Sequence, residues 1–461
     1  MPFSPARRIL LAALAALSVL APVALAQNAQ QTNGTRETKI ATPSAVSGPS
    51  DNTTFSQDNR FVRMLGFDSA AANLVPGDTN AKRDVYVLRR ASGEGDLSGS
   101  LLRVSVAGRN GVQANGDSTK PSIDGDTKRR PHCVTFQSTA TNLDRGDRSA
   151  DSDVYLRDVK RKTTKLVSVR HRNAINGVVD GECEFVTYEA SGSVFVRDLA
   201  AGKTAKIARG TQPDQQTNGK GVVYQRGGQI YQQAFQKVFN KGNPQVKKTA
   251  RELTVSAGNA GRGNGVSSNP SADDNGYYIA FESTATNLCR NLCKGVSEDG
   301  NGPVSDIYRR TISRKAPTRD KMQMVSFSFA VSQQGNGASN NPAMTGAGEN
   351  VSFDSEATNL RQSPGIKTVD PNGAVRDVYY WNFPRARATG NVSRESKPGS
   401  ELPKDRSFFN GPSVNPSSSN RANFIAFTST QSGLSGEGNG SAIEDVFIRF
   451  LGGGPEESAD E

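Results

Sequence analysis

One segment pattern occurs five times in the chain and constrains its fold more than any other feature. Each copy starts with an aromatic residue that is followed, two positions later, by Ser; the copies begin at Phe67, Phe136, Phe281, Phe353 and Phe427. A connection rich in Gly, Asn and Asp comes next, and then a second segment that opens with Asp and alternates Val or Ile with Tyr or Phe. Period-two alternation between turn-forming clusters is typical of β-strands. Each copy therefore predicts two strands joined by a connection of variable length.

Two more strands complete each unit. Segments with hydroxyl and aliphatic residues follow several copies, as in LLRVSV near Val104, TTKLVSV near Val167 and QMVSFS near Val325. A Pro-, Ser- and Gly-rich segment precedes each copy, as in NPSADDNGYYIAF before Phe281, and supplies an inner strand with its turn. The sequence thus predicts units of four strands.

The spacing of the copies gives the number of units. Phe136 and Phe281 lie 145 residues apart, whereas the other neighbouring copies lie 69 to 74 residues apart. The long interval holds two shorter copies, CEFVTYEASGSVFVRDLAAGKTAKIA and GVVYQRGGQIYQQAF followed by ARELTVSA. Repeated four-stranded units that bury their faces on their neighbours form a β-propeller. We expect an all-β fold with a single propeller of seven four-stranded blades over residues 36–450, with six blades as the alternative.

The two ends of the repeat region indicate how the ring closes. After Phe427 and Val446 the chain lacks a fourth strand, and TRETKIAT near Lys39 has the pattern of that missing strand. We expect this N-terminal strand to complete the last blade. The acidic, Gly-rich segment 451–461 is expected to be a disordered tail.

The copies resemble the TolB-like, WD-repeat-like propeller repeats of bacterial envelope and secreted proteins. The similar subgroup has units of the form F-x-S-x-A-x-N-L-V-x-G-D-x-N-x-x-x-D-V-F, and FDSAAANLVPGDTNAKRDVYV from Phe67 matches nearly throughout. The similarity covers residues 36 to 450. It is lost in part in the two short copies, and in the last copy Gly433 replaces the Asn. The resemblance implies a propeller fold and an extracytoplasmic location.

Composition agrees with a turn-rich β protein. The 461 residues are 34% hydrophobic and include 46 Gly, which is too lean in aliphatic residues for thick helical layers. Only 22% of the chain is charged, and short apolar segments recur throughout, so disorder over most of its length is not expected.

The N-terminal segment has the features of a secretory signal. Arg7 and Arg8 precede a short apolar stretch, and Ala24 and Ala26 give the small-x-small pattern that signal peptidase recognises. We predict a signal peptide over residues 1–26 with cleavage near Ala26, a short tail over 27–35, and a periplasmic or secreted protein. Cleavage lowers the formal charge from +11 to +9, because it removes two Arg.

Four cysteines are consistent with an oxidising compartment. Cys289 and Cys293 are close enough to close a small loop, and Cys133 and Cys183 each precede an apolar strand. We expect two disulfides, Cys289 with Cys293 and Cys133 with Cys183. A zinc site is the alternative, and it is disfavoured because neither His132 nor His171 stands at a ligand spacing from the Cys289–Cys293 pair.

The acidic connections are candidate calcium loops. Oxygen-bearing side chains recur at short spacings in three copies: Asp78, Asn80 and Asp84; Asp147, Asp151 and Asp153; Asp370, Asn372 and Asp377. Calcium needs six to eight converging oxygens, and the twelfth position from Asp78 is Arg89 where an EF-hand has Glu. We favour the alternative that these side chains bind nearby backbone amides and fix the connection, with no cofactor.

Basic residues are concentrated around the second copy. The candidates for binding a polyanion or another partner are Arg157, Lys160, Arg161, Lys162, Lys165, Arg170 and Arg172, to which Trp381 adds an aromatic residue at a possible protein-binding rim. Nucleic acid is a poor candidate for an exported protein. An envelope or extracellular protein, or an anionic glycan or lipid surface, fits better. The mature chain is expected to be monomeric and to have no transmembrane segment.

Two functional classes remain open from the sequence. No nucleophile elbow, zinc-protease motif or complete phosphate loop occurs, which favours an exported, non-catalytic scaffold that binds a protein or an envelope polymer. The alternative is a propeller enzyme, a hydrolase or lyase of polysaccharide or peptide, with acidic residues at the channel mouth. Several carboxylates or a metal converging in one pocket would favour the enzyme.

Overall fold

The computed structural model describes residues 38–42, 46–58, 62–90, 99–126, 129–147, 149–236, 245–247, 249–255, 261–289, 299–313, 320–328, 333–360, 370, 372–382, 391–396, 413–418, 424–431, 434 and 443–451. All the regular elements in these ranges are β-strands. None of the segments described forms a helix long and apolar enough to cross a membrane. The predicted signal peptide and the tail 27–35 lie outside these ranges.

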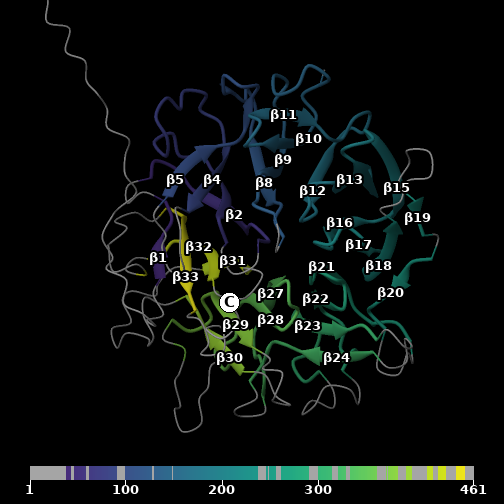
Figure 1. Ribbon diagram of the computed structural model, residues 1–461. Helices are drawn as coiled ribbons and strands as arrows, with labels where there is room; N and C mark the ends of the chain where they lie inside the picture. Colours follow the sequence, from purple (N-terminus) through teal and green to yellow (C-terminus); the bar gives the residue numbers. More distant parts are fainter. Residues whose placement is uncertain are drawn as a thin grey trace, which may run out of the picture.

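The strands form a single β-propeller, in which sheets are arranged around a central axis (Figure 1). The described residues give six four-stranded sheets, one five-stranded sheet and two short two-stranded ribbons. The sheets of the first half are β2 (Ser50–Phe55), β3 (Met64–Ser69), β4 (Asp84–Arg90) and β5 (Gly99–Arg103); β8 (Ser118–Ile123), β9 (Cys133–Ser138), β10 (Asp153–Asp158) and β11 (Thr163–Leu166); and β12 (Ala174–Val179), β13 (Phe185–Ala190), β14 (Ser193–Asp198) and β15 (Lys203–Arg209).

The second half continues the same order. Its sheets are β16 (Thr211–Gln215), β17 (Gly221–Arg226), β18 (Gln229–Gln236), β19 (Gln245–Val246) and β20 (Arg251–Glu252); β21 (Ser267–Ala272), β22 (Tyr278–Ser283), β23 (Asp306–Thr311) and β24 (Lys321–Met324); β27 (Ser339–Met344), β28 (Asn350–Ser355), β29 (Asp377–Asn382) and β30 (Asn391–Arg394); and β31 (Ser413–Ser418), β32 (Phe424–Ser429) and β33 (Asp445–Phe450) with β1 (Thr38–Ile40). The ribbons are β6 (Val106–Ala107) with β7 (Val112–Gln113), and β25 (Phe327–Ser328) with β26 (Gln333–Gln334). The two short copies of the repeat form the sheets β12–β15 and β16–β20.

The N-terminal strand closes the ring, as the sequence predicts. β1 pairs antiparallel with β33, so that Thr38 is opposite Arg449 and Ile40 is opposite Phe447. Figure 1 shows β1 beside the yellow C-terminal strand. Leu451, which we placed in the disordered tail, is instead buried against the apolar residues of this sheet and its neighbour β27–β30. The described part of the chain therefore extends the propeller to Leu451.

The core is divided among the interfaces between sheets, and the two aromatic residues of each repeat lie at its centre. Phe67 is opposite Tyr86 in the β3–β4 register, and their rings stack with centroids 5.9 Å apart. The same pairs occur in the later copies: Phe136 with Tyr155, Phe281 with Tyr308, Phe353 with Tyr379, and Phe427 with Phe447. These rings are buried because each sheet is covered by a neighbour on both faces.

The A-T-N residues of three copies fix the entry to the inner strand of their sheet. Asn264 donates from its backbone N–H to Asn287 Oδ1 at 3.0 Å, and its side chain exchanges two 2.8 Å hydrogen bonds with Thr286. We call this the Asn–Thr clamp. Asn115 and Asn336 form the same clamp with the A-T-N residues of their own copies. The A-x-N-L part of the motif is thus structural.

Candidate functional site

The centre of the ring is lined by the innermost strands, and each of them carries a bulge. The register shifts by one residue in every one of these strands, for instance between Asp51 and Thr54 in β2. The bulge places a non-Gly residue in the left-handed region, with φ between 46° and 53°; these residues are Asn52, Lys120, Asn176, Gln212, Asn269 and Asn341. Asn tolerates this conformation better than most residues, which explains its frequency here.

Four of these bulges are held by a side chain of the preceding sheet. The backbone N–H of Lys120 donates to Asp68 Oδ2 at 2.9 Å, and that of Asn341 donates to Glu282 Oε2 at 2.9 Å. Asn176 and Gln212 are bound in the same way by Gln137 and Glu189. The acceptors occupy the variable position of F-x-S or its equivalent in the short copy. We call this contact the inter-sheet latch, and it keeps the lining strands in fixed relative positions.

The inner strands enclose a polar cavity of about 450 Å³ on the ring axis. Its lining is dominated by amide and hydroxyl side chains together with prolines of the inner strands. Among the lining residues, Asp214 is the single carboxylate and Lys120 the single cation. The cavity can therefore offer many hydrogen-bond donors and acceptors but little net charge.

The two charged groups of the cavity have defined surroundings. Lys120 Nζ donates to Asn176 Oδ1 at 3.0 Å, and Asp214 Oδ2 accepts the backbone N–H of Ala272 at 2.7 Å. Burial raises the pKa of Asp214 to about 7, and the backbone hydrogen bonds offset this only in part. The ionisation of Asp214, and with it the charge of the cavity, therefore depends on pH near neutrality.

A series of backbone hydrogen bonds runs along one end of the cavity. The turns that follow the inner strands bind each other in sequence, with Gly125 N–H donating to Gly181 O at 3.0 Å and Gly181 N–H donating to Thr217 O at 2.9 Å. Asn218 N–H donates to Asp274 O, and Asp274 N–H to Gly346 O. Because Thr217 and Gly346 also line the cavity, this end is built from rigid backbone.

In two of the candidate calcium loops an arginine occupies the centre. Arg394 lies against Asp370 at 2.8 Å and also pairs with Asp377, and its Nη1 donates to Asn372 Oδ1 at 3.3 Å. Arg103 lies 3.2 Å from Asp78 and 3.6 Å from Asp84, and Asn80 donates to Asp84 at 3.1 Å. A guanidinium thus supplies the positive charge in these loops, which agrees with the structural alternative to calcium.

The loop of the second copy is organised by local hydrogen bonds. Asp147 accepts the hydroxyl of Tyr155 at 2.6 Å and the backbone N–H of Ser149 at 2.9 Å. Asp153 accepts the hydroxyl of Ser168, and burial raises its pKa to about 6. Asp151 points to Arg172, 3.6 Å away, so the three carboxylates are used separately.

The structure adds a fourth acidic loop that our sequence analysis missed. Gln334 Nε2 donates to both Asp299 and Asp306 at 2.7 Å. In the register of this sheet Met324 takes the place of Arg103 and Arg394, and burial raises the pKa of Asp306 to about 7. Asp299, Asn301 and Asp306 have the same spacing as Asp370, Asn372 and Asp377, so the spacing could have revealed them. Three side chains fall short of the oxygens that calcium takes.

Two of the predicted partner-binding residues are buried, which corrects the sequence analysis. Arg157 is 6% exposed and donates to Gly108 O and Thr164 Oγ1, and Trp381 is fully buried with Arg309 stacked over its ring at 4.8 Å. Both stand four residues after the Asp that opens their strand, as do Arg310 and Arg449, which are also buried. This repeat position faces the neighbouring sheet, so Arg157 and Trp381 do not belong to a binding surface.

The other basic candidates are exposed. Lys160, Arg161 and Lys162 form the turn between β10 and β11, and Arg161 pairs with Asp158 at 3.3 Å. Lys165, Arg170 and Arg172 are exposed nearby in sequence. We call Lys160, Arg161 and Lys162 the basic turn.

One of the two predicted disulfides is described in full. Cys133 and Cys183 are bonded to each other and join sheet β8–β11 to sheet β12–β15. Cys289 is also disulfide-bonded, and its expected partner Cys293 lies outside the described residues. The Cys133–Cys183 prediction is confirmed.

Comparison with known proteins gives distant similarities only. No protein-family profile matches the sequence, and no curated protein matches it. An oligogalacturonate lyase in complex with manganese shares 10% identity over 94% of this chain and 97% of its own, with a TM-score of 0.48. The oligogalacturonate lyase of Vibrio parahaemolyticus shares 12% over 91% and 99%, with a TM-score of 0.47. TolB from Acinetobacter baumannii shares 10% over 72% and 80%, with a TM-score of 0.33. The propeller architecture rests on the sheets themselves.

Proposed function

We propose that the protein is an exported, non-catalytic binding propeller that holds a polar segment of an envelope or extracellular protein, or of an envelope polymer, in its central cavity. The observation that supports this function is the lining of the cavity, which combines amides and hydroxyls from six inner strands with one carboxylate and one amine.

The same lining favours recognition over hydrolysis. Glycoside hydrolysis commonly needs two carboxyl groups on opposite sides of the scissile bond, and acid–base chemistry in general needs a positioned proton donor and acceptor. Among the described lining residues Asp214 has no second carboxylate beside it. A set of fixed amides and hydroxyls, in contrast, can bind a polar chain at several points.

The charge of the cavity indicates the chemistry of its occupant. Lys120 and ionised Asp214 have opposite signs, so a nearly neutral polar segment fits better than a polyanion. A polyanion would instead be attracted to the exposed basic turn, outside the cavity. We therefore place the main binding site in the cavity.

Site-specific photo-cross-linking in the native envelope tests this function. A photo-reactive amino acid replaces Lys120 in the cavity, and a matched chain carries it at Lys160 in the basic turn. We expect one partner to be captured from Lys120 and not from Lys160. Capture from Lys160 alone, or release of shortened polysaccharide or peptide by the purified protein, would overturn the proposal.

We also infer that the ring counts seven blades, with the five-stranded sheet as one of them. Its inner strand β16 contacts the inner strands β12 and β21 on either side. The series of backbone hydrogen bonds between the turns passes through its turn at Thr217 and Asn218. The added strand β20 pairs with β18 on the outer side and does not change the order of the ring. A crystal structure would check this count.

A further inference from the structure

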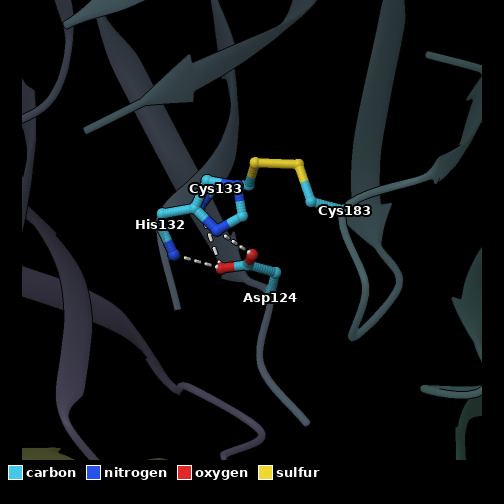
Figure 2. A group of neighbouring side chains, drawn as sticks. All are labelled: Asp124, His132, Cys133 and Cys183. Carbon is cyan, nitrogen blue, oxygen red and sulfur yellow. Dashed lines mark hydrogen bonds and ion pairs between the residues drawn. A yellow bond between two sulfur atoms is a disulfide. The ribbon is translucent and has the colours of Figure 1, made fainter. Parts of the chain in front are cut away.

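Four side chains with metal-ligating chemistry meet where sheet β8–β11 adjoins sheet β12–β15. Asp124 follows β8, His132 and Cys133 stand at the start of β9, and Cys183 lies in the turn before β13. One ligand atom from each of the four lies within 4.8 Å of the others, and Figure 2 shows the imidazole between the carboxylate and the disulfide. This cluster is separate from the lining of the central cavity.

Cys183 occupies a backbone position that favours glycine. Its φ is 55°, and its N–H donates to the carbonyl of Asp180, three residues earlier. The matching turns of other sheets place Gly219, Gly276 and Gly348 there, with φ between 65° and 74° and the same hydrogen bond. A side chain in this region costs roughly 1 kcal/mol. The sulfur of Cys183 must offset this cost through the contacts that it makes.

The turn between β8 and β9 also differs from the other described turns in carrying His132. Asp124 Oδ1 accepts the backbone N–H groups of His132 and Cys133 at 2.7 and 2.9 Å, and Asp273 caps its own turn in the same way. Only here among the described turns does an imidazole follow, with Nδ1 3.0 Å from Asp124 Oδ2. Two ligands of a tetrahedral zinc ion lie about 3.3 Å apart, so these two atoms are already near the required separation.

We propose that the reduced chain binds one zinc ion at this cluster, through the thiolates of Cys133 and Cys183, the imidazole of His132 and the carboxylate of Asp124. Zinc accepts Cys sulfur, His nitrogen and Asp oxygen as ligands, and four such donors complete its tetrahedral shell. In the disulfide state the sulfurs are bonded to each other, so the two states exclude one another.

A simple dithiol is sufficient to convert the disulfide into the two thiols that bind zinc. A dithiol reduces the Cys133–Cys183 bond by transferring two electrons and two protons, and is itself oxidised to a disulfide. Zinc then displaces the two thiol protons as it binds. The reductant and the ion have access, because the His132 side chain is 28% exposed and Cys183 is only partly buried, although Cys133 is covered.

Zinc binding to the full chain in its two redox states tests the proposal. Cys289→Ser and Cys293→Ser remove the second cysteine pair, and a phosphine reductant that does not itself compete for zinc opens the first. We expect calorimetry to give one zinc per reduced chain and none for the oxidised chain, and a higher melting temperature only when the reduced chain holds zinc. Cobalt in place of zinc should show a thiolate charge-transfer band.

Cys183→Gly is the decisive variant, because it restores the glycine of the other turns and should preserve the fold. We expect it to weaken zinc binding by at least about tenfold and to remove the cobalt band. Reduced chain that binds zinc no more tightly than this variant, or oxidised chain that binds it equally well, would overturn the proposal. If the chain with Cys289→Ser and Cys293→Ser does not fold, Cys183→Gly is made in the unaltered chain and compared with that chain. Both chains then keep Cys289 and Cys293, so any difference in zinc binding comes from Cys183.

Discussion

The glycine of the Asn–Thr clamp shows how strictly single residues are constrained in this fold. Gly265 follows the clamp residue Asn264, and a Cβ at this position would lie 2.5 Å from the backbone of Thr284 and Ala285. At Gly116 and Gly337 a Cβ would lie 2.6 and 2.8 Å from the nearest backbone atom of their own sheets. The inner strand can enter the sheet here only because these positions carry no side chain.

Gly265→Ala should lower the free energy of unfolding by about 1–3 kcal/mol, because the contacting backbone atoms cannot move aside. Gly300→Ala is the matched control, since a Cβ there would meet no atom closer than 3.7 Å. Urea denaturation with an unchanged m-value measures the difference. Equal midpoints for the two variants would contradict the assignment.

At this scale the sequence predicts hydrophobic positions better than charged ones. The aromatic residues, such as Phe67 and Tyr86, are found as expected because their alternation is visible in every copy. Arg157 is buried although charge predicts exposure, because its guanidinium reaches backbone carbonyls of the β6–β7 ribbon that no local pattern reveals. Aligning the copies would have placed it in one column with Trp381.

The inter-sheet latch is the main feature at the level of strands. Glu282 on β22 accepts the bulge N–H of Asn341 in the next sheet, and it also accepts hydrogen bonds from Asn269 and Ser268 in its own sheet. One carboxylate therefore fixes two inner strands at once. The latch orders the wall of the cavity, and the side chain of Asn269 that it binds belongs to the cavity lining.

Glu282→Ala should destabilise the protein by about 1–3 kcal/mol, since it leaves the Asn341 N–H without its acceptor. Glu282→Gln keeps one acceptor oxygen and should cost clearly less. Chemical denaturation of the two variants, with the photo-cross-linking assay as a second readout, measures the effect. An equal loss in both variants would show that charge, and not the acceptor, holds the strand.

The latch could not be predicted from the repeat. Its position in F-x-S is filled by Asp, Gln, Glu or Thr, which share no obvious chemistry in a list of sequences. The hydrogen-bond donor is a backbone N–H on another sheet. This N–H reaches the acceptor only because the bulge places its residue in the left-handed region. The two short copies, in contrast, can be predicted from the sequence, because the alternation of their strands survives the loss of the long connections.

Closure by β1 governs the stability of the whole ring. Val446, Phe447 and Ile448 of β33 are fully buried, and β1 covers the edge of that strand. Deleting residues 36–42 should lower the melting temperature, because it exposes this edge and removes the join. A variant that carries the same residues on a linker after Leu451 should regain the stability. An unchanged melting temperature after the deletion would contradict closure by this strand.

Buried carboxyl groups should make the stability of the ring depend on pH. Burial raises the pKa of both Asp214 and Asp306 from 3.8 to about 7. The folded chain thus keeps protons that the unfolded chain has lost, so the stability from these groups is full below about pH 4 and is lost as the pH rises through 7. We expect the melting temperature to fall between pH 5 and pH 8. Asp214→Asn, whose amide oxygen can still accept from Ala272, should reduce this fall in calorimetry, and an identical slope would contradict the assignment.

The pairing of Thr38 with Arg449 also sets the order of events during synthesis. The first strand to be made has its hydrogen-bonding partner at the other end of the repeat region, and such distant contacts form slowly. Each intervening sheet can pack against its predecessor as it appears, but the ring stays open until β33 has been made. The growing chain therefore passes through a lengthening open arc, and its final step is a single join between the earliest and the latest strands.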